Sequence, residues 1–331
     1  MKLLITREIP RAGINILKQY KDIEIDYRQG PPLSEKELLT AVKDADAIIP
    51  VIPDKINKKI INAAKKLRVI AAYSVGYDHI DVEHATSKNI FVGNTPGDLT
   101  ESVAEHALAL MLSAGRRIPE ADRFCRAGNN KYWNPMNFVG PKIMGDTLGI
   151  IGFGRIGQHL ARMAKNGLSM RILYTDVNRH PEAESLLDAE KVELDYLLEN
   201  SDFISIHCNL TPETENLIGE NEFRKMKPLA YIVNTARGKI INEEALARAL
   251  KQNYIAGAAL DVFADEPEIH PDLKLLDNIV LTPHIGSATW EARLQMARMA
   301  AENVVDVLIS NKPPRYLVNK ELMKETVASL I

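Results

Sequence analysis

The sequence predicts an α/β protein with two doubly wound parallel sheets, and three observations support this. Short apolar runs of strand length alternate with helical patterns along most of the chain. The length of 331 residues is about twice the roughly 150 residues of one domain. With 46% hydrophobic and 26% charged residues, the composition is that of an ordinary globular protein, which excludes disordered and fibrous classes.

The first part of the chain shows the βαβ pattern of a small parallel sheet. The strands are expected at 3–5, 23–25, 47–49, 69–71 and 90–92, with helices between them at 13–20, 35–42 and 57–64. A Pro-Gly turn at 94–98 breaks the pattern. We therefore expect the first segment of this domain to end at residue 98.

The second part begins with an apolar helix expected from Ser102 to Leu112, followed by an irregular loop at 128–141. A new strand–helix alternation starts at Thr147 and runs through 171–174, 203–206, 231–234, 257–260 and 279–282. The last segment, 289–310, is an amphipathic helix that could pack back onto the first domain. The expected division is one domain of residues 1–98 and 286–331 and a second of residues 99–285.

A glycine-rich run follows the first strand of the second part. Gly152 permits a tight turn, Gly154 lets the backbone approach a pyrophosphate, and Gly157 allows a helix to pack closely on the sheet. The next strand ends in Asp176 about twenty residues later, where a carboxylate can accept the ribose hydroxyls. This spacing predicts a Rossmann dinucleotide-binding domain; the alternative is a tight turn beside a solvated carboxylate. Asp176 favours NAD over NADP, although Arg179 could soften that exclusion.

Three residues with catalytic side chains each follow a predicted strand of this second sheet. They are Arg237, Glu266 and His284. Because ligands bind at the carboxyl edge of such sheets, we expect these side chains to converge there. Taken singly, Arg237 would be a surface arginine and Glu266 a solvated turn residue.

Several separated motifs also occur in an order typical of one family. They are Ser74–Asp81, Gly152–Gly157, Val233–Gly238, Leu260–Phe263 with Glu266-Pro267, and Thr282–Thr289. In these motifs the chain resembles the D-isomer-specific 2-hydroxyacid dehydrogenases, most of all the glyoxylate and hydroxypyruvate reductases. The resemblance implies a Rossmann NAD-binding domain, a flavodoxin-like substrate domain, and NADH as the cofactor with NADPH less favoured.

The resemblance also implies a chemical role for each of the three residues. Arg237 would hold the carboxylate and carbonyl oxygen of a 2-oxo acid with its planar fork of donors. His284 would give a proton to the carbonyl oxygen as a hydride arrives from the nicotinamide. Glu266 would fix the imidazole tautomer and favour the imidazolium.

Further residues of these motifs are carried over as binding residues. The cofactor set is Gly152, Gly154, Arg155, Ile156, Gly157, Asp176, Thr235, Ala236, Asp261 and Gly286. The substrate set is Val75, Gly76, Arg237, His284 and Ser287.

A homodimer is the expected assembly, because the 102–112 helix is apolar on more than one side. The stretch Trp133-Asn134-Pro135 resembles a segment that in the glyoxylate and hydroxypyruvate reductases reaches toward the partner's pocket; alternatively, Trp133 anchors its own loop. His106 lies on the same apolar helix and is expected to pack in a core or at the dimer surface.

Other partners and compartments are disfavoured. A net charge of −3 provides no basic field for nucleic acid, and no apolar run approaches the ~18 residues of a membrane span. Cys125 and Cys208 form neither a disulfide framework nor, with the histidines, a metal site. We expect a cytoplasmic protein without a metal.

Two kinds of function remain open. The first is reduction of glyoxylate or hydroxypyruvate, with D-lactate, phosphoglycerate or phosphite dehydrogenation as variants within the class. The second is a non-catalytic, NAD-sensing corepressor-like binding protein, since such relatives can keep Arg237, Glu266 and His284.

Overall fold

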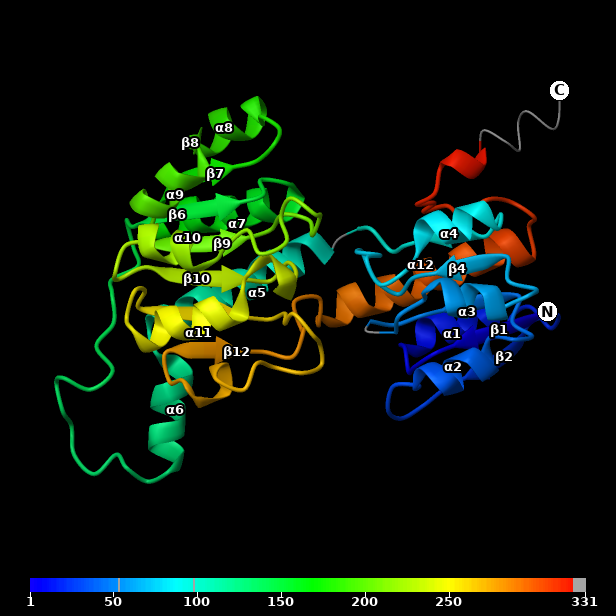
Figure 1. Ribbon diagram of the computed structural model, residues 1–331, viewed down its shortest axis with the longest axis horizontal. Helices are drawn as coiled ribbons and strands as arrows, with labels where there is room; N and C mark the ends of the chain where they lie inside the picture. Colours follow the sequence, from blue (N-terminus) through cyan, green and yellow to red (C-terminus); the bar gives the residue numbers. More distant parts are fainter. Residues whose placement is uncertain (53, 98, 324–331) are drawn as a thin grey trace. The chain divides into compact units, whose positions relative to one another are not determined.

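The computed structural model describes residues 1–52, 54–97 and 99–323, and the chain divides into two compact units (Figure 1). The first unit comprises Met1–Asp98 and Ala288–Ile331, and the second comprises Leu99–Ser287. Each is built on its own parallel sheet, which confirms the predicted fold class. Residues 53, 98 and 324–331, which belong to the predicted substrate domain, lie outside the described residues.

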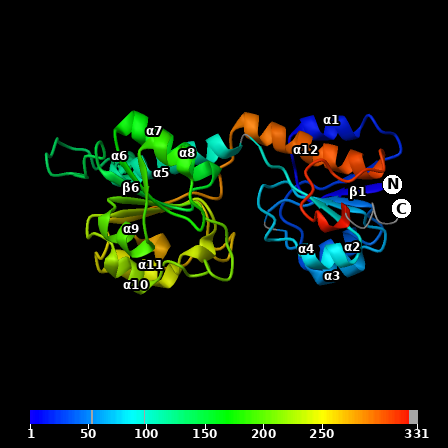
Figure 2. The ribbon, with the colours of Figure 1, turned by 90° about the horizontal axis from the view of Figure 1, so that it is seen from above.

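The described part of the first unit has five parallel strands in the order β2-β1-β3-β4-β5, the order of flavodoxin-like folds. The strands are β1 (Lys2–Ile5), β2 (Glu24–Tyr27), β3 (Ala47–Ile49), β4 (Val69–Ala71) and β5 (Phe91–Gly93). The helices are α1 (Arg11–Leu17), α2 (Glu35–Ala41), α3 (Lys58–Ala63), α4 (Val82–Ser87) and α12 (Trp290–Leu308). Figure 2 shows α1 and α12 on one face of the sheet and α2, α3 and α4 on the other.

The central strands of this sheet are apolar throughout because helices cover both faces. All three residues of β3 and of β4 are fully buried. The last helix, α12, packs against α1 and β4. The C-terminal helix therefore returns to the first unit, as its amphipathic pattern predicted.

The described part of the second unit has seven parallel strands in the order β12-β11-β10-β9-β6-β7-β8. This is the Rossmann order with one added strand. The strands are β6 (Thr147–Ile151), β7 (Arg171–Thr175), β8 (Ala189–Lys191), β9 (Phe203–Ile206), β10 (Tyr231–Asn234), β11 (Gly257–Leu260) and β12 (Ile279–Leu281).

Helices cover both faces of this second sheet (Figure 2). The helices and short 3₁₀ turns are α5 (Leu99–Gly115), α6 (Ile118–Arg126), α7 (Arg155–Leu168), α8 (Pro181–Leu187), α9 (Leu194–Asn200), α10 (Glu220–Lys225), η1 (Gly238–Ile240), α11 (Glu243–Lys251) and η2 (Leu273–Leu275). Helices α5 and α7 pack on one face, and α9, α10 and α11 pack on the other.

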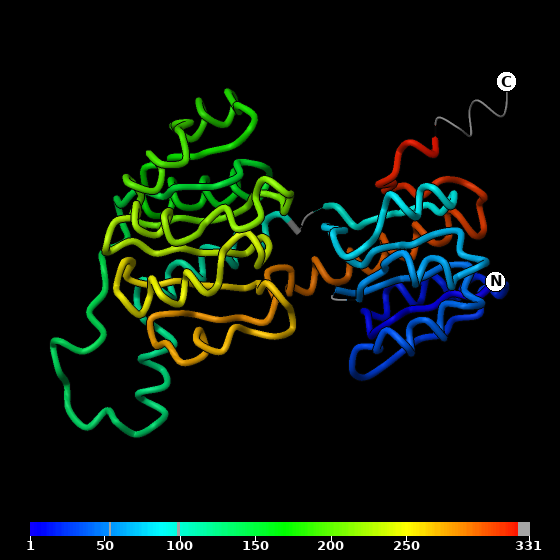
Figure 3. The backbone as a smooth tube through the Cα atoms, viewed as in Figure 1, coloured from blue at the N-terminus to red at the C-terminus, as the bar shows by residue number. Residues whose placement is uncertain are grey.

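Two elements of the second unit escaped the sequence prediction. Helix α6 buries none of its residues, so it lacks the apolar stripe by which helices are detected. Strand β8 is a three-residue edge strand whose Glu190 and Lys191 are exposed, as is common for protected sheet edges. The irregular loop expected at 128–141 is present. Figure 3 shows it as a long loop that follows α6 and extends away from the second sheet.

Candidate functional site

The glycine-rich run lies at the end of β6, where the strand order of the second sheet reverses. Gly152 has a φ of 90°, which is a left-handed conformation that glycine adopts without strain. A Cβ atom there would lie 2.4 Å from the backbone nitrogen of Cys208. A Cβ atom on Gly157 would lie 2.5 Å from the carbonyl oxygen of Gly152. Side chains at either position would push the loop away from its neighbours.

Helix α7 starts at Arg155, directly after Gly154, and no side chain caps it. A Cβ atom on Gly154 would meet no other atom within 4 Å, so the space in front of the helix is open. The N–H groups of the first turn and the helix dipole favour an anionic group at that place.

Asp176 follows β7, and its carboxylate is bound to the glycine-rich loop. Its Oδ2 atom accepts a hydrogen bond from the Phe153 N–H at 2.7 Å, and Oδ1 accepts one from the Asn178 N–H at 2.9 Å. Arg179, the nearby cation, is paired instead with Glu184 at 3.0 Å. The carboxylate therefore lies beside the glycine-rich turn, and no arginine among the described residues is paired with it.

Thr235 follows β10 on the other side of the strand reversal. Its hydroxyl is buried and has no hydrogen-bond partner among the described residues. Such an orphaned polar atom is costly unless a ligand or water satisfies it. Together with the open space at Gly154, it makes this edge of the sheet fit a bound dinucleotide.

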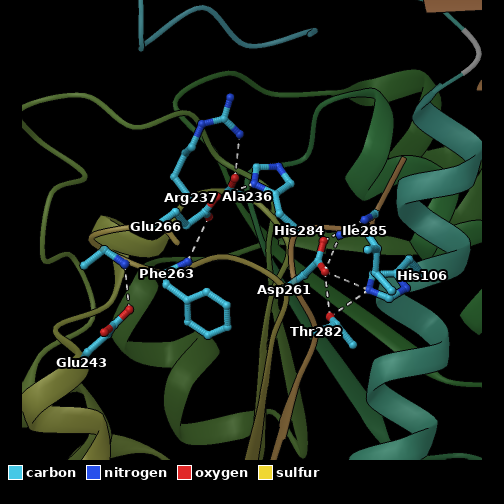
Figure 4. A network of polar contacts seen from close by, with 12 residues as sticks. His106, Ala236, Arg237, Glu243, Asp261, Phe263, Glu266, Thr282, His284 and Ile285 are labelled. Carbon is cyan, nitrogen blue, oxygen red and sulfur yellow. Dashed lines mark hydrogen bonds and ion pairs between the residues drawn. The ribbon is translucent and has the colours of Figure 1, made fainter. Parts of the chain in front are cut away.

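Of the three residues predicted to be catalytic, His284 and Glu266 are in direct side-chain contact (Figure 4). The Nδ1 atom of His284 lies 2.7 Å from Oε2 of Glu266. The other carboxylate oxygen, Oε1, accepts the N–H of Phe263 at 3.0 Å. Because the carboxylate is fixed by the backbone, it holds the imidazole in one orientation.

Arg237 lies on a neighbouring loop, shaped by the fully buried Asn234. The Asn234 side chain accepts the Ala236 N–H at 3.0 Å and donates to the Arg237 carbonyl at 2.8 Å. A Cβ atom on the next residue, Gly238, would lie 1.9 Å from the carbonyl carbon of Phe263. The arginine loop is thus in direct backbone contact with the loop that carries Glu266. The structure brings Arg237, Glu266 and His284 to adjacent loops at the carboxyl edge of one sheet.

Asp261 follows β11 and is 1% exposed. Its carboxylate accepts the N–H groups of Ile285 and Gly286, each at 2.8 Å. Burial raises the pKa of this carboxyl, but hydrogen bonds from His106, Thr282 and Ile285 outweigh burial and lower it. The aspartate is therefore ionised and turned toward the loop after His284.

Val75 and Gly76 belong to the first unit, in the loop after β4, and Ser287 follows Gly286 at the end of the second unit. Asn94 donates to the Val75 carbonyl at 2.8 Å, and the Ser74 hydroxyl donates to the Gly76 carbonyl at 2.7 Å. Within residues 1–52, 54–97 and 99–323, no acceptor is found for the N–H of Val75 or of Gly76. The loop therefore presents two N–H donors.

Sequence reasoning missed the residues that support this cluster. His106 was expected to pack in a core or at a dimer surface; its side chain is 17% exposed, and the sequence did not predict that its Nε2 would lie 3.2 Å from Asp261 Oδ1. Asn234 and Thr282 gave no signal beyond their place at strand ends. A polar residue in the last position of a buried strand is the clue that could have found Asn234.

The comparisons with known proteins agree with this geometry. Residues 108–286 match the model of the D-isomer specific 2-hydroxyacid dehydrogenase NAD binding domain. The chain is 47% identical over 327 residues to a glyoxylate reductase of Thermococcus litoralis, covering 97% of this chain and 98% of that protein. The chain belongs to this dehydrogenase family. It is also 47% identical over 326 residues to a glyoxylate reductase of Korarchaeum cryptofilum, covering 98% and 97%.

A solved structure shows the same fold over nearly the whole chain. The TT0316 protein from Thermus thermophilus superposes with a TM-score of 0.89 and 39% identity, covering 96% of this chain and all of that one. As a dehydrogenase of this family, the chain is a nicotinamide-dependent oxidoreductase that reduces a 2-oxo acid to a hydroxy acid. The family resemblance seen in the sequence is confirmed.

Within the part of the chain that the structure describes, no helix has both the length and the apolarity to cross a membrane. The same residues contain no group of three or more histidine, cysteine or acidic side chains placed to hold a metal ion.

Proposed function

We propose that this dehydrogenase reduces glyoxylate to glycolate with NADH, with hydroxypyruvate as the second candidate substrate. The observation that carries the proposal is the 2.7 Å pair of His284 with Glu266 on a loop adjacent to that of Arg237. The glyoxylate reductases that match over 97% and 98% of the chain support the choice of substrate.

His284 is the proton donor in this proposal. Its Nδ1 faces the Glu266 carboxylate, so Nε2 is the nitrogen directed to the substrate. Glu266 accepts the Nδ1–H and stabilises the positive charge of the imidazolium. Once Nε2 gives its proton to the carbonyl oxygen, the pair remains as a neutral imidazole hydrogen-bonded to a carboxylate. The reverse reaction returns that proton.

Arg237 holds the 2-oxo acid in this proposal. The planar guanidinium suits a carboxylate and the neighbouring carbonyl oxygen, since both can be bound by one fork of donors. Polarised in this way, the carbonyl carbon accepts a hydride and the oxygen takes the proton from His284, which balances the reduction. Val75, Gly76 and Ser287 stay predicted substrate-binding residues, on the strength of the family motifs that contain them.

The dinucleotide is held by the residues around the strand reversal. A bound nicotinamide supplies the hydride. We place the pyrophosphate at Gly154, Arg155 and Ile156, where the helix start is open. Asp176 takes the ribose hydroxyls, and the nicotinamide side lies toward Thr235, Ala236, Asp261 and Gly286. NADH is preferred over NADPH because Asp176 would repel a 2′-phosphate and Arg179 is engaged by Glu184.

The active form is proposed to be a homodimer. In the single chain, Tyr132 and Met136 are each 75% exposed and Trp133 is 84% exposed. A side chain this exposed contributes little packing to its own loop, and this supports contact with a second copy. We also propose a cytoplasmic location, because Cys125 and Cys208 are both free thiols.

The test is the decay of NADH absorbance with glyoxylate, hydroxypyruvate, pyruvate and phenylpyruvate. Glyoxylate or hydroxypyruvate should give the highest kcat/KM, and NADPH should support a lower rate. His284→Ala should reduce kcat by at least about 10²-fold, as loss of a general acid does, whereas His84→Ala in the first unit should match the wild type. A chain that binds NADH but reduces no acid would contradict the proposal and favour the NAD-sensing binding protein.

A further inference from the structure

One residue holds the backbone on which the proposed proton donor sits. The carbonyl oxygen of Asp261 accepts the His284 N–H at 2.8 Å. Its two carboxylate oxygens accept the next N–H groups, those of Ile285 and Gly286, at 2.8 Å each. Three successive amides therefore point to a single aspartate.

This arrangement compensates for an unfavourable backbone conformation. His284 has a φ of 53°, in the left-handed region that is unfavourable for a residue with a Cβ atom. Left-handed residues turn successive N–H groups toward one point, which creates a concave site for an anion. The Asp261 carboxylate is that anion. If it turned away, the Ile285 and Gly286 N–H groups would lose their acceptor, and His284 would keep only the bonds of its own N–H to the Asp261 and Thr282 carbonyls and of its ring to Glu266 among the contacts given for the described residues.

Two side chains keep the carboxylate from turning. The Thr282 hydroxyl donates to Oδ1 of Asp261 at 2.6 Å. His106, from the middle of α5, has its Nε2 at 3.2 Å both from that oxygen and from the Thr282 hydroxyl oxygen. Since a carboxylate only accepts, Nε2 carries the hydrogen in this contact. Figure 4 shows His106 reaching the aspartate from α5, on the side away from Glu266 and Arg237.

We propose that His106, with Thr282, is a positioning residue for the proton donor: it fixes Asp261, and Asp261 fixes the backbone of residues 284–286. This rests on the proposed role of His284. His106 touches neither His284 nor Glu266 through any contact that the structure gives. Its effect on the reaction must therefore pass through Asp261 and the loop.

The experiment compares His106→Ala with His106→Gln. A glutamine Nε2 group can occupy the place of the imidazole Nε2 and donate the same hydrogen bond, so it should restore the function. His106→Ala should lower kcat about tenfold, as expected for losing a hydrogen bond to a charged group, with the dissociation constant of NADH changed less than about twofold. His106→Gln should recover most of that kcat. His159→Ala, which removes a partly exposed histidine of the same unit paired only loosely with Glu101 at 3.9 Å, should leave kcat unchanged.

A second readout does not depend on turnover. Hydrogen exchange of the 284–286 amides should accelerate in His106→Ala and in Thr282→Val, and should stay slow in His106→Gln and Thr282→Ser. If His106→Ala does not fold, Thr282→Val carries the same test from the other partner of the aspartate.

The outcomes separate this inference from the proposed function. Wild-type protein that reduces no 2-oxo acid would overturn the proposed function, while the exchange measurement would still test the loop network. Equal kcat for His106→Ala and wild type, equal losses in the alanine and glutamine variants, or unchanged exchange of the loop amides would each overturn the positioning role.

Discussion

Replacing Gly238 by alanine should force apart the two loops that carry Arg237 and Glu266. The added Cβ atom would lie 1.9 Å from the carbonyl carbon and 2.2 Å from the carbonyl oxygen of Phe263. Ordinary contacts begin at 3.4 Å, so the two backbones must separate by about 1.5 Å, the difference between these distances.

The two loops have little freedom to absorb that shift. The Phe263 N–H is held by Glu266 at 3.0 Å, and the following N–H, of Ala264, is held by Glu243 at 2.7 Å. A displacement of about 1 Å in an active site can cost roughly 10²-fold in rate. We therefore expect kcat/KM to fall about 100-fold, or about 2.7 kcal/mol of transition-state stabilisation. Overpacking should also lower the free energy of unfolding by about 1–3 kcal/mol.

The assay is steady-state NADH oxidation with glyoxylate, with unfolding in urea followed for the same samples. Gly167→Ala is the matched control in the same unit. It lies exposed in α7, and a Cβ atom there would meet no other atom within 4 Å. Since alanine is favoured over glycine in helices, this control should keep full activity and gain about 0.5–1 kcal/mol of stability. A folded Gly238→Ala variant with kcat/KM within threefold of wild type would refute the reasoning.

Three further predictions concern other parts of the second unit. Burial lowers the pKa of His207 to about 3, whereas the same histidine in the unfolded chain has an ordinary pKa of about 6.5. Between these two pH values the unfolded chain binds a proton at this histidine and the folded chain does not. The contribution of this group to the free energy of unfolding is therefore fully present above about pH 6.5 and falls by about 1.4 kcal/mol per pH unit from there down to about pH 3. In urea unfolding, the free energy of His207→Gln should depend less steeply on pH than that of the wild type, and equal slopes would contradict this. Asp176→Asn should raise KM for NADH about tenfold and reduce the preference for NADH over NADPH, measured as the ratio of the two KM values. Asn178→Ala is the control, and an unchanged ratio in Asp176→Asn would argue against the role of the carboxylate. Asn234→Ala should lower kcat/KM with glyoxylate about tenfold by releasing the arginine loop, with a loss of about 1–3 kcal/mol in stability; wild-type kinetics would show that its two hydrogen bonds do not position Arg237.

Several features of the molecule could be predicted from the sequence because each depends on short stretches of chain. Apolar runs of strand length separated by helical patterns determined two parallel α/β sheets, since strands covered on both faces must be apolar throughout. The glycine spacing determined a turn between β6 and α7, because the turn and the helix start are local. The amphipathic stripe of α12 indicated that this helix could pack on the first unit, where it lies against α1 and β4. Elements without a buried stripe, such as α6, left no such signal.

Only the tertiary structure decided how the loops of Arg237, Glu266 and His284 are supported. The 1.9 Å approach of a Gly238 Cβ to Phe263 and the contact of His106 with Asp261 join residues that are 25 and 155 positions apart in the sequence. No periodicity relates such residues, because their contacts depend on which strands become neighbours and on how far each loop extends beyond the sheet. The residue types and their order determined the family chemistry, whereas the packing of β10, β11 and β12 beside α5 decided which polar groups hold His284 in place.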